Sequence, residues 1–388
     1  MLRPAISALP ASRIREVANA GLGRDDLLKF WFGEGDRLTP EFIRAAAHES
    51  IEAGDLFYNA NLGLPELREA LAAYLSRLYG ITPSLPKERI TVTSAGVHAL
   101  MLVAQALIEP GDRVVVITPV WPNVTAIPTI LGGVVERVPL QASAGVWSLQ
   151  LDSLLDALTP STRLLIVNSP NNPTGWTMDA ETWRIVRQHC AQRGIWVLAD
   201  DAYARLVYDG APAAPSPLAQ VDEDERFVSA NTFSKAWCMT GWRLGWLVGP
   251  REFITQVGKL TEFNTSCAPG FVQRAGIAAL TQGEDFVTDQ LLQLAARRSQ
   301  LVQGLASLPG VEVAPPTGAM YGFFRLPGRS DDSLGFAKQL VARVGLGLAP
   351  GIAFGPEAEG WLRWCFAARQ ERIDAGLARL ADFLADRD

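Results

Sequence analysis

Lys235 lies at the end of an apolar, β-prone run, in the stretch NTFSKAWCMTGWRLGW at residues 231–246. Ser234 precedes this lysine, and Arg243 follows a Met-Thr-Gly turn. A lysine amine held in a site can form a Schiff base with an aldehyde, whereas hydroxyls and an arginine can bind a phosphate dianion. A solvated loop lysine is the ordinary alternative, so this stretch alone does not decide between the two.

Two further polar clusters follow apolar runs. NNPTG (171–175) comes after RLLIVNSP, and DDAY (200–203) comes after IWVLA. In open α/β sheets, ligands bind beyond the carboxyl ends of the strands, so clusters at the ends of successive strands can converge on one crevice. Taken singly, NNPTG is a good turn sequence, and DDAY could cap a helix. Their occurrence in order with FSK (233–235) predicts one shared site.

The residue types in these clusters suit one kind of chemistry. A carboxylate can keep a pyridine nitrogen protonated, so that the ring acts as an electron sink for a bound amine. A phenol and an amide can hydrogen-bond a ring oxygen, and hydroxyls with the amides of a helix N-terminus can bind a phosphate. These clusters would suit an aldehyde cofactor that has a charged ring and a phosphate.

The elements that must position these residues indicate an α/β domain. Continuous apolar character predicts strands covered on both faces, as in a parallel or mixed sheet, at 113–119, 163–170, 195–203, 226–233 and 244–250. Apolar residues at helical spacing predict helices at 63–80 and 180–194. We expect the large domain to span residues 45–285.

The pattern changes after residue 285. DQLLQLAARRSQLVQGLASLPG predicts a long amphipathic helix, VEVAPPTGAMYGFFRLP predicts two short strands around a turn, and a last helix is expected near 370–386. We expect a smaller α+β domain at 286–388, with the N-terminal segment 1–44 packed against it. The predicted fold class is therefore α/β, with a mixed, mostly parallel sheet flanked by helices and a second, smaller domain.

Composition excludes several classes of function. The chain has 388 residues and a net charge of −6, which gives no indication of a nucleic-acid or anionic membrane partner. No apolar run approaches the ~20 residues of a membrane span. The four cysteines and three histidines show no metal-binding spacing, so we expect no metal and reduced thiols. These features predict a cytoplasmic globular protein.

Nearly the whole chain resembles the fold-type I, class I/II aminotransferases, which use pyridoxal 5′-phosphate (PLP). The resemblance rests on FGEGD (32–36), YNANLGLPELREALAAYL (58–75), TSAGVHAL (93–100), PGDRVVVITPVWPN (110–123), NSPNNPTG (168–175), ADDAY (199–203), FSKAWCMTGWRLGW (233–246) and LRWCFA (362–367). FGEGD or GLPELRE alone would be weak evidence, whereas the combination is highly specific.

The resemblance implies a role for each residue of these motifs. Lys235 is the Schiff-base lysine and proton shuttle, Asp200 partners the pyridine nitrogen, and Tyr203 bonds the phenolic oxygen; these three are the expected catalytic residues. The remaining expected cofactor contacts are Ala95, Gly96, Trp121, Asn172, Thr232, Ser234 and Arg243, with Tyr58 reaching the phosphate of the other subunit.

Substrate contacts also follow from the resemblance. Arg363 matches the arginine that binds the substrate α-carboxylate, and Gly33, Trp121 and Asn172 are expected beside the substrate. Two positions depart from the pattern of the family. At the first, Val97 replaces a common hydroxyl residue, which removes one side-chain phosphate contact. At the second, Gly35 replaces a proline.

The implied function is amino transfer between an amino acid and a 2-oxo acid, by a ping-pong reaction in a homodimer with shared sites. A PLP-dependent C–S β-lyase on the same fold is the alternative. A non-catalytic PLP-binding regulatory module would require a basic helix-turn-helix segment before residue 40, for which the sequence has no room. The motifs leave the substrate open, and specificity is expected from the N-terminal segment, the stretch after Trp121, Arg205 and the region 264–269.

Overall fold

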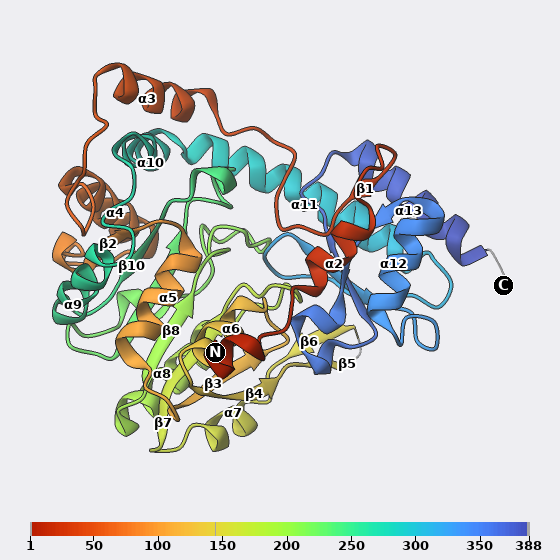
Figure 1. Ribbon diagram of the computed structural model, residues 1–388, viewed down its shortest axis with the longest axis horizontal. Coiled ribbons are helices and arrows are strands. Elements are labelled where there is room, and N and C mark those ends of the chain that lie inside the picture. Colours follow the sequence, from red (N-terminus) through yellow and green to blue (C-terminus); the bar gives the residue numbers. More distant parts are fainter. Residues whose placement is uncertain (1, 144, 386–388) are drawn as a thin grey trace.

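The computed structural model describes residues 2–143 and 145–385, and a seven-stranded sheet forms its centre (Figure 1). The strands run in the order β2 (Ile90–Thr93), β10 (Gly245–Val248), β9 (Phe227–Thr232), β8 (Trp196–Asp200), β7 (Thr162–Asn168), β3 (Arg113–Thr118) and β4 (Val134–Pro139). β10 is antiparallel to β2 and β9, whereas the other neighbouring strands pair in parallel. The predicted mixed, mostly parallel sheet is confirmed.

Helices cover both faces of this sheet because successive strand residues point to opposite sides. Val114 and Val116 of β3 pack with α5 (Gly96–Leu107), α6 (Asn123–Ile130) and α9 (Arg251–Glu262). Val115 and Ile117 belong to the core on the other face, together with α4 (Pro65–Tyr79), α7 (Leu151–Ala157), α8 (Ala180–Arg193) and α10 (Gly270–Gln282). The predicted helices at 63–80 and 180–194 are confirmed, and Gly80 and Gly194 end them in the left-handed conformation.

A second, antiparallel sheet is formed by the C-terminal part of the chain. Its order is β11 (Glu312–Ala314), β12 (Tyr321–Arg325), β15 (Trp361–Cys365) and β14 (Ala349–Pro350). α11 (Glu284–Ala306) extends from α10 towards the C-terminal helices α12 (Ser333–Val344) and α13 (Gln370–Ala385) (Figure 1). The described residues also form five 3₁₀ segments: η1 (Lys87–Arg89), η2 (Pro217–Ala219), η3 (Thr240–Trp242), η4 (Gly351–Phe354) and η5 (Pro356–Ala358).

The N-terminal segment contacts both parts of the molecule. α2 (Arg13–Ala20) packs against α12 and β14, and β1 (Leu28–Lys29) pairs in parallel with β13 (Leu346–Gly347). α1 (Pro4–Ser7) contacts α6, and α3 (Glu41–Glu52) packs on α10. The hairpin β5 (Gln141–Ser143) and β6 (Val146–Ser148) places Trp147 against Trp361, with ring centroids 4.8 Å apart. The division into 1–44, 45–285 and 286–388 stays a prediction.

Within residues 2–143 and 145–385, every helix is too short or too polar to cross a membrane.

Candidate active site

A cavity of about 560 Å³ brings together most of the predicted site residues. It opens beyond the carboxyl ends of β7, β8 and β9, where Asn168 lies beside Asp200 in the sheet register. The predicted residues that line it are Gly33, Gly96, Trp121, Asn172, Asp200, Tyr203, Thr232, Ser234, Lys235, Arg243 and Arg363. Ala95 is buried beside this cavity without lining it, and Tyr58 lies outside it with a side chain that is 91% exposed.

Lys235 follows β9 and points its amine into the cavity. Its Nζ donates a hydrogen bond to the Gly33 carbonyl over 2.6 Å. Burial lowers the pKa of Lys235 to about 8, and the positive charges of Arg363 and Arg243 act in the same direction. A larger fraction of this amine is therefore neutral near pH 7 than for an exposed lysine, which makes it a better nucleophile and base.

Asp200 ends β8 as a buried carboxylate, and among the described residues no cationic side chain hydrogen-bonds it. Burial raises the pKa of Asp200 to about 6, although the Ala202 N–H at 3.4 Å and the charge of Lys235 oppose that rise. The neighbouring Asp201 lies outside the cavity lining and accepts a hydrogen bond from Ser229 Oγ over 2.5 Å. Only Asp200 of this pair faces the cavity, so a cationic ring would find its partner there.

A candidate anion site lies where β9 and β10 meet the start of α5. Ala95 precedes the helix with φ of 94°, and no side chain caps the helix N-terminus. Gly245 permits this approach, because a Cβ atom there would lie 2.8 Å from the Gly96 nitrogen. The hydroxyls of Thr232 and Ser234 are 2.9 Å apart and line the same end of the cavity. Backbone amides at a helix N-terminus together with hydroxyls form a ready phosphate site.

Arg243 and Val97 complete this end of the cavity. Arg243 has a left-handed backbone, with φ of 54°, and its Nη1 donates to the Thr240 carbonyl over 2.7 Å. Val97 lines the cavity with an apolar side chain, so it offers its backbone alone to an anion. The guanidinium of Arg243 could supply positive charge to a phosphate bound at this end.

Arg363 lines the cavity from β15 of the second sheet. It is 2% exposed, and its Nη1 donates to Asn172 Oδ1 over 2.8 Å. Nη2 donates to the Trp31 carbonyl, whereas the buried Nε has no hydrogen-bond partner among the described residues. A buried guanidinium without a carboxylate partner is a natural site for the carboxylate of a ligand.

The cavity lining also contains residues that the sequence did not single out, among them Tyr321, Arg15 and Asn168. Tyr321 of β12 places its hydroxyl 2.5 Å from that of Tyr203, and Arg15 of α2 reaches the cavity from the N-terminal segment. Asn168 accepts a hydrogen bond from the Asn172 N–H over 2.8 Å and so holds the NNPTG loop. Asn168 stands within the motif NSPNNPTG, which was a usable signal, whereas Tyr321 and Arg15 lie in stretches without one.

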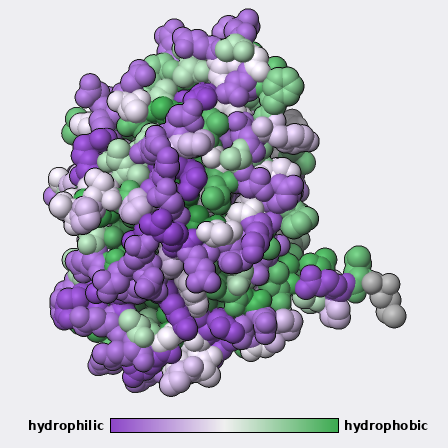
Figure 2. Space-filling model, turned by 90° about the vertical axis from the view of Figure 1, so that its left-hand side faces the viewer, coloured by the Kyte–Doolittle hydropathy of each residue, from purple (hydrophilic) through white to green (hydrophobic). Residues whose placement is uncertain are grey.

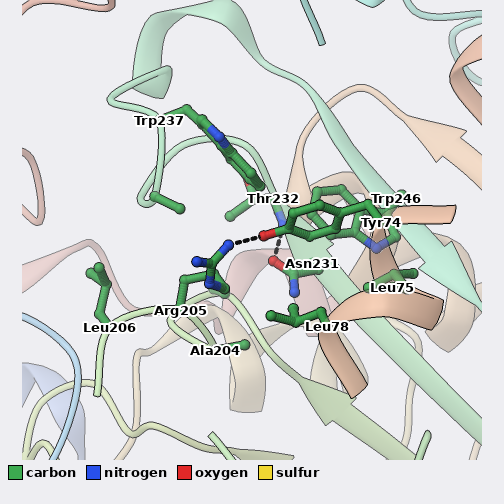
Figure 3. A pocket seen from close by; sticks show the side chains of 12 residues that line it. Tyr74, Leu75, Leu78, Ala204, Arg205, Leu206, Asn231, Thr232, Trp237 and Trp246 are labelled. Carbon is green, nitrogen blue, oxygen red and sulfur yellow. Dashed lines mark hydrogen bonds between the residues drawn. The ribbon is translucent and has the colours of Figure 1, made fainter. Parts of the chain in front are cut away.

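Arg205, which we expected among the specificity residues, lies elsewhere. It donates to the Tyr74 hydroxyl (Figure 3). It also donates to the Glu284 carboxylate over 2.8 and 2.9 Å. The cavity beside it is about 10 Å³, which is about the size that one water molecule needs. Residues 264–269 are also absent from the lining of the large cavity.

The residues of the large cavity fit a ring cofactor that carries a phosphate. Asp200 is a buried carboxylate without a hydrogen-bonded cation, and Asn172 Nδ2 has no acceptor among the described residues. The uncapped start of α5 supplies amides at one end, next to two hydroxyls and Arg243. This donor set matches the charged ring, ring oxygen and phosphate of PLP.

Comparison with known proteins gives a consistent result. Residues 27–380 match the family described as aminotransferase class I and II. The chain is 31% identical to the aspartate aminotransferase of Pyrococcus horikoshii, over 95% of this chain and 93% of that protein. It is also 31% identical to a probable aspartate/prephenate aminotransferase of Aquifex aeolicus, over 99% of this chain and 97% of that protein.

Solved structures show the same similarity in three dimensions. The aspartate aminotransferase of Thermus thermophilus with maleate superimposes with a TM-score of 0.90 at 31% identity, covering 98% of this chain and 99% of that one. An aminotransferase from Mycobacterium tuberculosis gives a TM-score of 0.91 at 30% identity, with 100% of both chains covered.

Proposed function

Because the chain belongs to the class I and II aminotransferase family and is a PLP-dependent transaminase, we propose that Lys235 binds its cofactor and moves the proton during the reaction. When bound, the cofactor supplies an aldehyde that takes up an amino group and a ring that stabilises negative charge on the substrate Cα. The observation that supports these roles is that one cavity contains the Lys235 amine, the buried Asp200 carboxylate and the Arg363 guanidinium.

Each side chain has a defined task in this proposal. Asp200 pairs with the ring nitrogen, whose positive charge offsets the desolvation of the carboxylate. Tyr203 and Asn172 hydrogen-bond the ring oxygen, and Arg363 binds the substrate α-carboxylate. With its lowered pKa, Lys235 Nζ accepts the proton from Cα as a general base.

The assignment of Lys235 is tested by labelling. Borohydride reduction of the purified holoenzyme, followed by peptide mapping, should place the pyridoxyl group on Lys235. The other lysines, at 29, 87, 259 and 338, lie outside the cavity and serve as internal controls. A label on any of them contradicts the assignment.

None of the relatives described above is named as a lyase, which favours amino transfer over the C–S β-lyase alternative.

We further propose that the amino donor carries a second carboxylate, as aspartate does, and that Arg15 binds it. The Arg15 guanidinium lies 5.7 Å from the Phe32 ring centroid at the cavity wall. Among the described residues its side chain forms no hydrogen bond or ion pair. Apolar residues that line the same cavity include Ile14, Phe32, Val97, Leu100 and Trp121.

Arg15→Gln tests this substrate class. It should lower kcat/KM for aspartate or glutamate about tenfold or more, the effect of one charge-assisted hydrogen bond, and leave alanine unchanged. Arg13→Gln on the same helix is the matched control, because Arg13 pairs with Glu16 at 2.8 Å and does not line the cavity. Equal losses for dicarboxylic and neutral donors would show that Arg15 does not select the substrate.

A homodimer with shared sites is part of the proposal. Its support is an exposed apolar cluster formed by Leu56, Phe57, Tyr58 and Phe263, of which Tyr58 and Phe263 are 91% and 90% exposed. The Asn59 N–H, which donates to Cys267 Sγ, ties these two segments together. The face that includes α3, α4 and α9 mixes hydrophobic with hydrophilic side chains (Figure 2). A second copy of the chain would bury the cluster and bring Tyr58 to the partner's cavity.

Location and domain limits complete the proposal. We place the protein in the cytoplasm, which is supported by the free state of Cys190, Cys238, Cys267 and Cys365. The large domain would span 45–285, with 1–44 and 286–388 forming the smaller part.

A further inference from the structure

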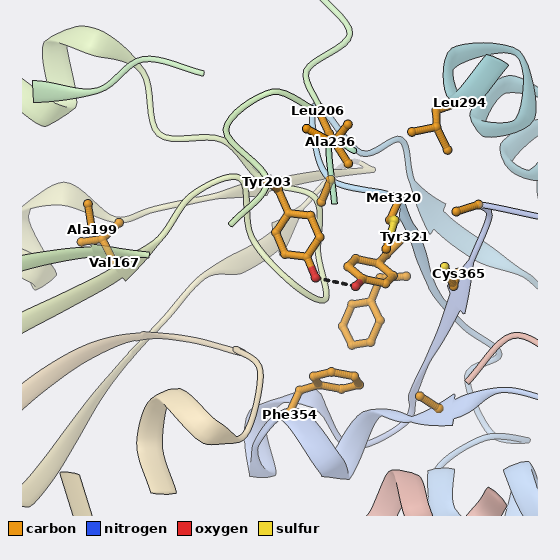
Figure 4. Close-up of a cluster of buried hydrophobic side chains, with 14 of the residues drawn as sticks. Val167, Ala199, Tyr203, Leu206, Ala236, Leu294, Met320, Tyr321, Phe354 and Cys365 are labelled. Atoms are coloured by element: carbon orange, nitrogen blue, oxygen red, sulfur yellow. Dashed lines mark hydrogen bonds between the residues drawn. The ribbon is translucent and has the colours of Figure 1, made fainter. Parts of the chain in front are cut away.

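Two buried phenols meet where the seven-stranded sheet faces the second sheet. The hydroxyls of Tyr203 and Tyr321 are 2.5 Å apart, and their rings meet edge to face with centroids separated by 5.6 Å (Figure 4). Tyr203 follows β8 and is 5% exposed, whereas Tyr321 begins β12 and is fully buried. Each hydroxyl has the other as its only hydrogen-bond partner among the described residues.

The substrate-facing arginine lies directly against this pair. The Arg363 Cζ is 4.4 Å from the Tyr321 ring centroid and 4.9 Å from that of Phe354. β12 and β15 are paired so that Phe323 lies opposite Arg363, which fixes the guanidinium next to Tyr321. A cation over an aromatic face is attracted to the ring and makes its phenol a stronger hydrogen-bond donor.

Each of the two phenols has a single proton to donate, and this sets the direction of the hydrogen bonds between them and to the cofactor. Burial raises the pKa of both phenols, so both keep their protons at neutral pH. If Tyr203 donates its single proton to the cofactor ring oxygen, it can only accept from Tyr321. Tyr321 then donates to Tyr203, and hydrogen bonds in such a chain strengthen one another.

We propose that Tyr321 is a positioning residue that couples carboxylate binding at Arg363 to the hydrogen bond that Tyr203 donates to the cofactor. This inference rests on the proposed function, because it assumes that Tyr203 contacts the ring oxygen. A carboxylate at Arg363 neutralises the cation over the Tyr321 ring, so Tyr321 becomes a weaker donor to Tyr203, and Tyr203 a weaker donor to the cofactor. The cofactor therefore holds its proton more tightly once a carboxylate is bound.

Other charged and titratable groups face the pair and stay the same in a Tyr321 variant. Lys235 Nζ lies 5.6 Å from the Tyr203 ring centroid. The remaining groups are Asp200, Glu34 and the thiol of Cys365, which lies opposite Tyr321 in the sheet. A difference between wild type and Tyr321→Phe therefore reports the hydroxyl alone.

The experiment is a pH titration of cofactor absorbance in the holoenzyme, with and without maleate, a dicarboxylate that has no amino group. Tyr321→Phe should raise the absorbance pKa of the ligand-free enzyme by about 0.5 to 1, the effect of one lost hydrogen bond. In wild type we expect maleate to raise this pKa further. The rise should be smaller in Tyr321→Phe but not absent, because the Arg363 charge also acts on Lys235 through space and Arg363 contacts Asn172 directly. Both results together support the coupling.

The matched control is Tyr208→Phe, which removes the hydroxyl of a partly buried tyrosine that donates to the Ala319 carbonyl outside the cavity. That variant should titrate like wild type. An unchanged absorbance pKa and maleate response in a folded Tyr321→Phe enzyme overturns the coupling alone. An unchanged absorbance pKa in Tyr203→Phe overturns the assignment of Tyr203 and, with it, the coupling.

Discussion

At the scale of single residues, the site depends on buried charged groups that have no hydrogen-bonded opposite charge among the described residues. The pKa of Asp200 is raised and that of Lys235 is lowered because burial penalises each charged form. The buried guanidinium of Arg363 likewise faces the cavity with no carboxylate hydrogen-bonded to it among the described residues. In the proposed roles of Asp200 and Arg363, a bound charged ring and a bound carboxylate would supply the missing opposite charges, so ligand binding would offset the cost of burying these groups.

Arg363→Lys tests the carboxylate role. The guanidinium is held by Asn172 and the Trp31 carbonyl and lies between the Tyr321 and Phe354 rings, an arrangement that a lysine ammonium cannot reproduce. We expect kcat/KM for amino acids to fall by the equivalent of roughly 2–5 kcal/mol, with the absorbance spectrum of the bound cofactor unchanged. Simple amines, which lack a carboxylate, should be affected much less. Equal losses for amines and amino acids, or loss of the cofactor, would make Arg363 a structural residue.

Asp201 should make stability depend on pH. Burial, and secondarily the neighbouring Asp200, raises its pKa from 3.8 to about 7 in the folded protein. The folded state therefore binds this proton more tightly than the unfolded state, and the free energy of unfolding falls as pH rises from about 4 to 7. Asp201→Asn should flatten that fall, measured by urea unfolding of the holoenzyme at several pH values. The exposed Asp152→Asn on α7 is the control, and identical pH profiles for Asp201→Asn and wild type would contradict the expectation.

At the scale of elements, the sequence predicted the parts of the site that follow strands. NNPTG, DDAY and FSK stand directly after apolar runs, and β7, β8 and β9 do end there. Tyr321 and Arg15 were missed for a physical reason. Their elements reach the cavity through long-range packing, of α2 on α12 and of β12 beside β15, and no local pattern encodes such contacts.

The packing of β10 against the start of α5 gives a prediction at this scale. In Gly245→Ala, the new Cβ would lie 2.6 Å from the Asn231 carbonyl oxygen and 2.8 Å from the Gly96 nitrogen. Such contacts force the two elements apart, which should cost roughly 1–3 kcal/mol of stability and weaken cofactor binding at the helix N-terminus. Gly241→Ala is the control, because its Cβ meets nothing within 4 Å. Urea unfolding and the dissociation constant of the cofactor measure both effects, and a Gly245→Ala enzyme that matches Gly241→Ala in both would refute this account.

At the scale of the whole molecule, the site is shared between two sheets. Lys235 and Asp200 come from the seven-stranded sheet, whereas Arg363 and Tyr321 come from the four-stranded one. Contacts between the two parts hold the two sheets in a fixed relative position. Arg137 of β4 pairs with Glu357 at 2.9 Å, and the Val120 N–H donates to the Phe354 carbonyl over 3.1 Å.

The last prediction concerns two copies of the molecule. Tyr58 is 91% exposed and lies outside the cavity of its own chain, so any contact with a cofactor must be made in a partner's site. Subunits with Tyr58→Ala and subunits with Lys235→Ala should each be impaired alone. After subunit exchange, heterodimers contain one site with both residues intact, and activity should rise to the level set by random pairing. Leu292→Ala on α11 is the control for Tyr58→Ala. Leu292 is exposed but lies outside the apolar cluster, so this variant should be active without mixing. Sedimentation gives the oligomeric state directly, and a monomer at working concentration, or no recovery in a mixture that has exchanged subunits, would contradict shared sites.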